Sequence, residues 1–533
     1  MSGTGHTGLR RLIANLLVVR ASGFLADHQR RYPRWELANA ELQALLAQGV
    51  GGVILLGGSA AEVALRCRQL EQWAEQPLLL CADVEEGVGQ RFEGASWLVP
   101  PLALGRLHGR DRPRALALAE RYGRCCGLDA RRLGLNWLLA PVCDINNNPA
   151  NPVINVRAFA EEPAAAGELA AAFIRGAASA GVLTCAKHFP GHGDTSSDSH
   201  LELPLLPHSR ERLQAVELPP FQAAIAAGVS SVMTGHLLLP ALDPLQPATL
   251  SAAVLTGLLR QDLGFGGLIV TDALVMDAIA GRYGAGEAAV LALEAGADLV
   301  LMPADARGAL EAIEAAVADG RLSASRLEQS AARRQSALQG VGAAASPPWL
   351  AAQPDTPLIQ ELVESSLEQQ GGAVTAATAA AGVNLVRLDN PLAAPFLPPD
   401  APALTLPEAR GWRPCLLAPQ GPSPWSGDPQ APLALDRLGS GPLLLQLFVR
   451  GNPFRGAAGS DEPWPAAVQQ LLVAGRLAGL AVYGSPYLWQ ALRPLLPAEL
   501  PAIYSPGQMP AAQGVVLERL GLGTPGASGG FTD

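Results

Sequence analysis

The sequence lacks the features of several classes of protein. Glycine, proline or a charged residue interrupts every apolar run before it reaches the roughly 20 residues that cross a bilayer. Lysine and arginine form no stripe that would follow a phosphate backbone, and the formal net charge is −10. We therefore expect a soluble protein that has no membrane span and does not bind nucleic acid.

Cysteine is scarce and shows no pattern of paired sites. The seven cysteines are scattered, and the adjacent Cys125 and Cys126 lack the CxxC spacing of a zinc or redox site. Reduced thiols are expected rather than a disulfide framework. The apolar stretch Leu12–Val19 is short, is closed by Arg20 and has no small-residue cleavage site after it, so we interpret it as a strand rather than a secretory leader.

The chain does contain a regular alternation of two kinds of segment. Between about residues 10 and 340, short apolar runs alternate with Ala- and Leu-rich segments of helical spacing, which is the pattern of βα units. No glycine-rich phosphate turn follows the first run, which disfavours an open doubly wound sheet. Eight runs predict a closed (β/α)8 TIM-type barrel: Leu12–Val19, Gly52–Leu56, Leu78–Ala82, Leu138–Val142, Val182–Ala186, Ser231–Thr234, Leu268–Thr271 and Leu299–Met302.

The length of 533 residues favours more than one domain. We predict the barrel over residues 1–340, a linker over 341–356 that is rich in helix and strand breakers, and a smaller α/β domain over 357–533. In this second domain strands are expected at Val383–Leu388, Pro442–Phe448 and Leu480–Tyr483, and Leu392–Ser440 is expected to be irregular. It shows no motif that indicates chemistry, so we assign it no activity.

Charged residues follow several of the predicted barrel strands. Asp83 follows the third run, Asp144 the fourth and Asp272 the seventh, while the fifth run leads into the loop 187–202, KHFPGHGDTSSDSHLE. That loop holds three of the eight histidines of the chain. Reactive residues of such barrels lie at the C-terminal ends of the strands, and clustered charge there is costly unless it is paired or used. The sequence therefore predicts an active site at this end of the barrel.

Four segments together give the chain a family resemblance. It resembles the family-3 glycoside hydrolases, and specifically their β-N-acetylglucosaminidase (β-N-acetylhexosaminidase) branch. Four motifs in the right order make the resemblance specific, and the DSH triplet selects the branch. The segments are KHFPGHG at 187–193 with DSH at 198–200, DVEEGVGQRF at 83–92, APVCDIN at 140–146 leading to NPVINVR at 151–157, and VTDALVM at 270–276.

The resemblance implies retaining, exo-acting hydrolysis of terminal non-reducing β-N-acetylhexosamine residues. Retention needs a carboxylate that traps the oxocarbenium-like centre and an acid that protonates the leaving oxygen. Asp272 at the end of an apolar strand is expected to be the nucleophile. His200 is expected to be the general acid and base, because histidine titrates near neutral pH, and Asp198 is expected to orient its ring.

The resemblance also implies the residues that hold the terminal sugar. They are Asp83, Arg157, Lys187 and His188, whose donors and carboxylate suit the hydroxyl groups of a sugar. We expect no metal and no cofactor. The family further implies cytoplasmic trimming of peptidoglycan-derived fragments, the cell-wall muropeptides, whereas the oligomeric state has no signal in the sequence.

Three alternatives remain open at this stage. A metal-dependent hydrolase could gather His188, His192, Asp194 and His200 around zinc. A phosphorylase on the same fold could use phosphate as the acceptor. A non-catalytic sugar-binding barrel is suggested by departures from the family pattern, namely Glu86, Ala158 and Ala273, although these departures leave every proposed reacting group in place.

Overall fold

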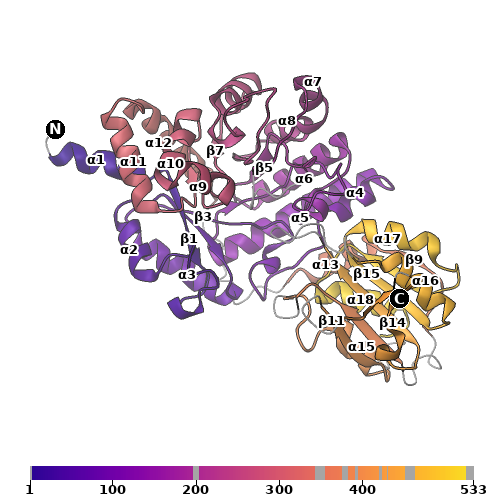
Figure 1. Ribbon diagram of the computed structural model, residues 1–533. Helices are drawn as coiled ribbons and strands as arrows, with labels where there is room; N and C mark the ends of the chain where they lie inside the picture. Colours follow the sequence, from indigo (N-terminus) through magenta and orange to yellow (C-terminus); the bar gives the residue numbers. More distant parts are fainter. Residues whose placement is uncertain are drawn as a thin grey trace. The chain divides into compact units, whose positions relative to one another are not determined.

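The computed structural model contains two compact units (Figure 1). One comprises Met1–Trp97 and Leu104–Thr356, and the other comprises Leu98–Ala103 and Pro357–Asp533. Most of the predicted linker lies outside the described part of the chain, so its conformation stays a prediction. The structure describes residues 3–195, 203–342, 354–374, 382–390, 394–418, 423–428, 430–450 and 462–523.

The first unit is a closed barrel of parallel strands, as predicted. Its strands form two sheets, of order β4-β3-β2-β1-β8 and β5-β6-β7. Parallel bridges between Trp137 and Leu183 and between Val270 and Leu299 join the two sheets on both sides. The strands are β1 (Leu17–Ser22), β2 (Gly52–Leu56), β3 (Leu79–Ala82), β4 (Trp137–Leu138), β5 (Cys185–Phe189), β6 (Ser231–Thr234), β7 (Leu268–Val270) and β8 (Val300–Leu301).

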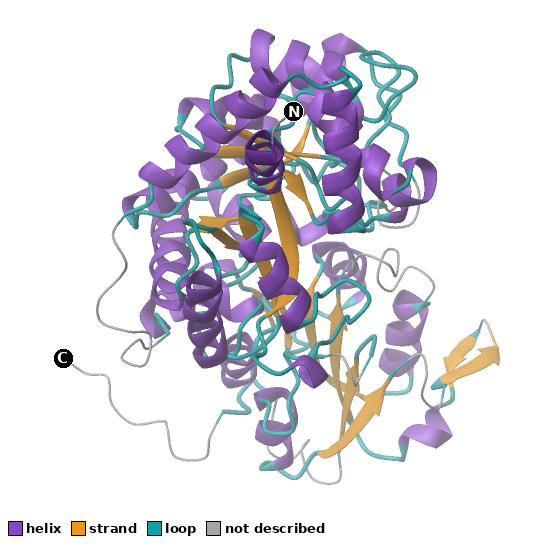
Figure 2. Cartoon of the chain, turned by 90° about the vertical axis from the view of Figure 1, so that its left-hand side faces the viewer, coloured by secondary structure: helices purple, strands orange, loops and turns teal. Residues whose placement is uncertain are grey.

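Helices surround these strands, as Figure 2 shows. Gly181, Gly228 and Gly296, which lie at the C-terminal ends of three of these helices, have positive φ angles of 76°, 80° and 122°. The helices are α1 (Gly3–Ala14), α2 (Asn39–Ala47), α3 (Ala60–Trp73), α4 (Leu102–His108), α5 (Arg112–Leu133), α6 (Pro163–Ser179), α7 (Arg210–Arg212), α8 (Pro219–Ala226), α9 (Asp277–Tyr283), α10 (Ala285–Ala295), α11 (Ala306–Ala318) and α12 (Ala324–Gln339), with π-helical turns at Leu213–Glu217 and Ala253–Asp262.

The first predicted strand was wrong in its first half. Residues Leu12–Ala14 end helix α1, and the strand starts only at Leu17. Ile13 and Ala14 are fully buried, as are Leu17 and Val18, so apolar residues broken only by Asn15 cover the end of a helix and the start of a strand. Hydrophobicity alone cannot place the boundary inside such a run.

Alternate residues of the strands fill the interior of the barrel. Leu79 and Cys81, Leu183 and Cys185, and Leu268 and Val270 belong to one buried cluster, which also contains Val18. Because successive side chains of a strand point to opposite faces, the next inward position lies two residues further along each strand. Those positions are occupied by four charged residues from the odd-numbered strands, which we call the charged layer: Arg20, Asp83, Lys187 and Asp272.

The second unit is a six-stranded α/β sheet. Its strand order is β11-β10-β14-β15-β16-β9, and every neighbouring pair is parallel except β16 with β9. Separate apolar clusters lie around Leu445 and Trp464 and around Leu444 and Val516, so both faces of the sheet are buried. The elements are α13 (Thr356–Ser366), β9 (Glu368–Gln370), β10 (Val383–Arg387), α15 (Pro402–Glu408), β11 (Arg413–Leu417), β12 (Trp425–Asp428), β13 (Ala431–Leu433), β14 (Leu443–Val449), α16 (Trp464–Val473), β15 (Leu477–Gly484), α17 (Pro486–Leu492), β16 (Ala502–Ser505) and α18 (Pro510–Arg519).

The three strands expected in this unit are confirmed as β10, β14 and β15. The expectation that Leu392–Ser440 is irregular was wrong, because α15 and β11 lie within it. Prolines hide both elements from sequence patterns: Pro407 lies inside α15, and Pro414 lies in β11, which is the edge strand where proline is tolerated. Among the described residues, no helix is long and apolar enough to cross a membrane.

Candidate active site

A network of four charged side chains lies at the C-terminal end of the barrel. Lys187, on β5, places its Nζ 2.7 Å from Asp83 Oδ1 and 2.7 Å from Glu85 Oε1. Arg157 donates two hydrogen bonds to the Glu85 carboxylate, from Nε to Oε2 at 2.8 Å and from an Nη atom to Oε1 at 2.9 Å. Lys187 is 1% exposed, whereas the Asp83 side chain is 35% exposed. Asp83 is therefore the member of the network that faces solvent.

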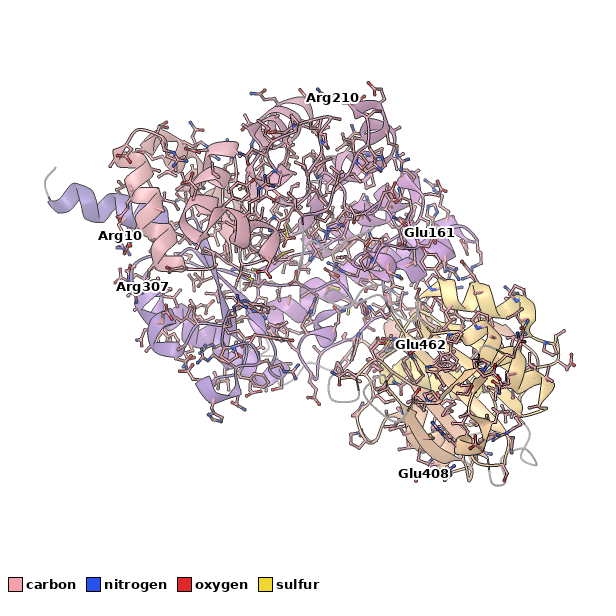
Figure 3. The ribbon with its side chains drawn as sticks, viewed as in Figure 1. Arg10, Glu161, Arg210, Arg307, Glu408 and Glu462 are labelled. Carbon is pink, nitrogen blue, oxygen red and sulfur yellow. The ribbon has the colours of Figure 1, made fainter. Side chains whose placement is uncertain are left out.

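The network keeps all its members charged. Burial would raise the pKa of Glu85, but the charges of Arg157 and Lys187 outweigh burial and hold that pKa well below its usual range. The pKa of Asp83 is lowered too, because Lys187 and Arg91 outweigh the effect of burial. Burial would lower the pKa of Lys187, but the two carboxylates raise it above its ordinary value. Exposed pairs such as Arg210 with Asp262, at the outside of the unit (Figure 3), have no such protection from water.

Asp144 organises the start of the loop that follows β5. Its Oδ2 lies 2.7 Å from His188 Nδ1, and its Oδ1 accepts hydrogen bonds from the backbone N–H groups of His188 and His192, at 3.1 and 2.7 Å. Burial would raise the pKa of Asp144, but His188 and these hydrogen bonds lower it. Asn151 donates to the carbonyl groups of His192 and Gly193, at 2.8 Å each. The loop segment up to Gly193 is therefore held from several sides.

His192 is a hydrogen-bonded residue within this loop. Its Nδ1 lies 2.8 Å from the hydroxyl group of Thr195, and the side chain is 1% exposed. Burial lowers the pKa of His192 to about 4, so the ring is neutral near pH 7. This environment suits a residue that shapes the loop rather than one that transfers a proton.

Asp272 follows β7 and is half-buried. Its Oδ1 accepts a hydrogen bond of 2.7 Å from the backbone N–H of Ala273, and its own N–H donates to the hydroxyl group of Thr234 at 3.3 Å. His236 is fully buried, with Nε2 3.1 Å from the carbonyl oxygen of Ala273. These contacts fix the position of Asp272 on the rigid end of the barrel.

The Cys185 thiol is influenced by three members of the charged layer. Burial raises the pKa of this thiol to about 12, and the charges of Lys187, Asp83 and Asp272 all act on it. Cys185 lies in the core two residues below Lys187. The structure thus brings together at one mouth five of the predicted site residues: Asp83, Arg157, Lys187, His188 and Asp272.

The other two predicted residues, Asp198 and His200, lie outside the described residues, so the expected dyad stays a prediction. Two residues of the site, Glu85 and Asp144, were not predicted as site residues. Glu85 lies two positions after Asp83 in the same motif, and that spacing is the signal that could have found it. Asp144 was recognised at a strand end, but its partners belong to another βα unit, with His188 in β5 and His192 after it, and could not be inferred from spacing.

A possible group of metal ligands is formed by two residues between β5 and α7 and one residue of the π-helical turn Leu213–Glu217. Among the described residues, potential ligand atoms of Asp194, His208 and Glu217 lie within 4.8 Å of one another. An Nη atom of Arg212 lies 3.4 Å from Asp194 and 3.3 Å from Glu217. A guanidinium group therefore already supplies the positive charge between the two carboxylates, and we assign no metal to them.

Comparison with known proteins gives the family. The Glycosyl hydrolase family 3 N terminal domain matches residues 9–337, and the Bacterial Glycosyl hydrolase family 3 C-terminal domain matches residues 375–521. A β-hexosaminidase of Stenotrophomonas maltophilia (strain K279a) is 37% identical over 271 residues, which are 50% of this chain and 80% of that protein.

Solved structures agree with this assignment. A glycoside hydrolase family 3 β-N-acetylglucosaminidase from Paenibacillus sp. str. FPU-7 has a TM-score of 0.77 and 29% identity, and the match covers 97% of each chain. The β-N-acetylhexosaminidase of Beutenbergia cavernae DSM 12333 has a TM-score of 0.54 and 28% identity, over 62% of this chain and 98% of that one. The chain belongs to glycosyl hydrolase family 3 and is a glycoside hydrolase.

Proposed function

We propose that the enzyme is a retaining, exo-acting β-N-acetylglucosaminidase that releases terminal non-reducing β-N-acetylhexosamine residues. The observation that carries this proposal is the barrel mouth, where the half-buried carboxylate of Asp272 lies with the charged network of Asp83, Glu85, Lys187 and Arg157. Such a mouth offers a nucleophile beside a set of fixed polar groups that can hold one sugar ring.

In the proposed first step, the Asp272 carboxylate attacks the anomeric carbon and the glycosidic C–O bond breaks. The leaving oxygen takes a proton from His200, whose imidazolium form Asp198 stabilises. In the second step, neutral His200 takes a proton from water, and the water oxygen displaces Asp272 from the anomeric carbon. Two inversions at this carbon give overall retention of configuration.

The network would bind the terminal sugar through its hydroxyl groups. Asp83 has an exposed carboxylate that can accept hydrogen bonds, while Lys187 holds it in place. The Nδ1 of His188 is engaged by Asp144, which leaves Nε2 to contact the sugar. Arg157 is held in place by two hydrogen bonds to Glu85. This preorganisation supports binding of a single sugar in one orientation.

We further propose that the substrates are peptidoglycan-derived muropeptides and that the enzyme acts in the cytoplasm. All seven cysteines are free thiols, six of them buried, which is compatible with a reducing compartment. Incubation with purified muropeptides and mass spectrometry of the products would test the substrate. Release of N-acetylglucosamine is expected, and unchanged fragments would contradict the proposal.

The central experiment measures release of a chromophore from a β-N-acetylglucosaminide and from the matching β-glucoside, each with and without phosphate. We expect faster release from the N-acetylglucosaminide and free sugar as the product even with phosphate present. A sugar phosphate as the product would identify a phosphorylase. Lack of turnover of either compound would favour the non-catalytic sugar-binding barrel.

Matched variants assign the chemistry to Asp272. Asp272→Asn is expected to lower kcat at least about a thousandfold, because it removes the nucleophile of a covalent mechanism. Asp277→Asn removes an exposed carboxylate five residues further along the chain and is expected to change kcat by less than twofold. Comparable activity of the two variants would contradict the proposed role of Asp272.

A further inference from the structure

Arg20 is the fourth member of the charged layer, and neither the family motifs nor the proposed mechanism gives it a role. It follows the core residue Val18 by two positions, as Asp83 follows Cys81. Arg20 pairs with Ile54 of β2, and Ile54 pairs with Cys81 of β3. The inward-facing side chains of Arg20 and Asp83 therefore lie two strands apart at the same mouth of the barrel. The Arg20 side chain is 13% exposed.

The donors of Arg20 are little used within the protein. Its closest carboxylate is Glu36, whose Oε1 lies 3.6 Å from an Nη atom, beyond hydrogen-bond distance. Within the described part of the chain, no group accepts a hydrogen bond from the Nε of Arg20, and this atom is buried. A guanidinium group carries five N–H donors, so Arg20 retains donors for a ligand.

Two aromatic rings from the loop between β1 and α2 cover this guanidinium. The Arg20 Cζ lies 5.1 Å from the centroid of the Tyr32 ring and 5.8 Å from that of Trp35. The two rings stack on each other at 5.8 Å with an angle of 26° between their planes. Tyr32 is 44% exposed, so part of its ring remains open to solvent.

The loop that carries the two rings is held in place by hydrogen bonds. Glu36 Oε2 accepts a hydrogen bond of 3.1 Å from the Tyr32 N–H, and the Glu36 carbonyl oxygen accepts one of 2.7 Å from Arg30. The N–H of Leu37 donates to the Arg20 carbonyl oxygen at 3.1 Å and ties the loop back to β1. Tyr32 and Trp35 are therefore held next to Arg20 before any ligand arrives.

We propose that Arg20, Tyr32 and Trp35 form the subsite for the leaving group, and that they bind the sugar ring attached to the scissile oxygen. The apolar C–H face of a pyranose packs on an aromatic ring, while a guanidinium donates to its hydroxyl groups. Asp83 and its network are assigned to the terminal sugar. The neighbouring Arg20, Tyr32 and Trp35 are therefore assigned to the second sugar of the substrate. This inference rests on the proposed function.

The test compares two substrates that share the terminal sugar and differ in the leaving group. N-acetylglucosaminyl β-fluoride has no second sugar, whereas the β-1,4-linked disaccharide of N-acetylglucosamine has one. Tyr32→Ala is expected to lower kcat/KM for the disaccharide by about tenfold, as expected for the loss of one aromatic contact, and to leave kcat/KM for the fluoride unchanged. Tyr32→Phe keeps the ring and should retain activity on both substrates.

Leu65→Ala, which removes a similarly exposed apolar side chain on α3, is the matched control and should behave as wild type. If wild type cleaves both substrates and Tyr32→Ala cleaves the disaccharide as well as wild type does, the proposed subsite is wrong but the proposed function stands. Equal losses of Tyr32→Ala on both substrates would also overturn the subsite, because Tyr32 would then act on the terminal sugar or on the fold. A wild type that cleaves neither substrate would contradict the subsite and the proposed function together.

Discussion

At the scale of single residues, Glu85 shows how the site depends on charge pairing. One buried carboxylate binds both Lys187 and Arg157, and their charges hold its pKa well below the usual range. Two buried cations that share one anion leave little tolerance for its loss, because an unpaired buried charge is costly. Glu85 is therefore a positioning residue for two groups that are assigned to the substrate.

Substitution of Glu85 tests this role. Glu85→Gln keeps the shape but removes the charge, and we expect it to lower the free energy of unfolding of the barrel by roughly 3 kcal/mol. KM should rise, since Lys187 and Arg157 lose their common anchor. Glu93→Gln, an exposed neighbour in sequence, is the control. Urea unfolding and steady-state kinetics measure both effects, and equal behaviour of the two variants would contradict the account.

His192 gives the site a pH dependence of stability. Its pKa is about 4 in the folded protein because of burial, against about 6.5 when unfolded. Between these values the unfolded chain binds the proton and the folded one does not, so stability rises with pH in this window. We expect wild type to be about 1.6 kcal/mol less stable at pH 5 than at pH 6.5 from this group alone.

The control for this prediction is His192→Asn, which has no titratable ring. Urea unfolding at the two pH values should show a smaller loss of stability in the variant than in wild type. An identical loss in both proteins would mean that His192 is not the buried neutral group described here.

At the scale of elements, the two ends of the barrel differ in what their residues do. Arg334, on α12, donates hydrogen bonds of 2.6 Å to the carbonyl oxygens of Gly51 and Pro77, which precede β2 and β3. It lines a cavity of about 1020 Å³ at the N-terminal ends of the strands, away from the charged layer. Burial lowers its pKa to about 10. This end of a barrel is expected to serve stability rather than chemistry.

Removal of Arg334 should therefore separate stability from activity. Arg334→Met removes a donor from both carbonyl groups, although that of Gly51 still accepts a hydrogen bond from the N–H of Leu79, and we expect a loss of about 1–3 kcal/mol in the free energy of unfolding. The kcat and KM of the folded enzyme should stay as in wild type. Arg307→Met, at an exposed arginine labelled in Figure 3, is the control. A selective fall in kcat without loss of stability would contradict this division.

The elements also show what could be predicted from the sequence. The barrel strands were recognisable because each is a short buried run that glycine or charge interrupts, and β2 and β6 were predicted residue for residue. The boundary between α1 and β1 was not, because both sides of it are apolar. Arg20 was noted only as the end of an apolar run, since its partners Tyr32 and Trp35 are brought to it by tertiary packing.

At the scale of the whole molecule, the family assignment covers both units, whereas every described residue with a proposed role lies in the first. The Stenotrophomonas maltophilia relative matches only half of this chain but 80% of its own length. The second unit offers a fully formed α/β sheet with no motif that indicates chemistry. The proposed catalysis therefore depends on residues at the mouth of the barrel.

The most direct test of the central claim is to identify the residue that forms the covalent intermediate. A 5-fluoro derivative of N-acetylglucosaminyl fluoride should label the enzyme, because the ring fluorine slows turnover of the glycosyl-enzyme while the fluoride leaves readily. After proteolysis, mass spectrometry should place one sugar on Asp272, and Asp272→Asn should not be labelled. Labelling of any other residue, or turnover without a covalent adduct, would contradict the account.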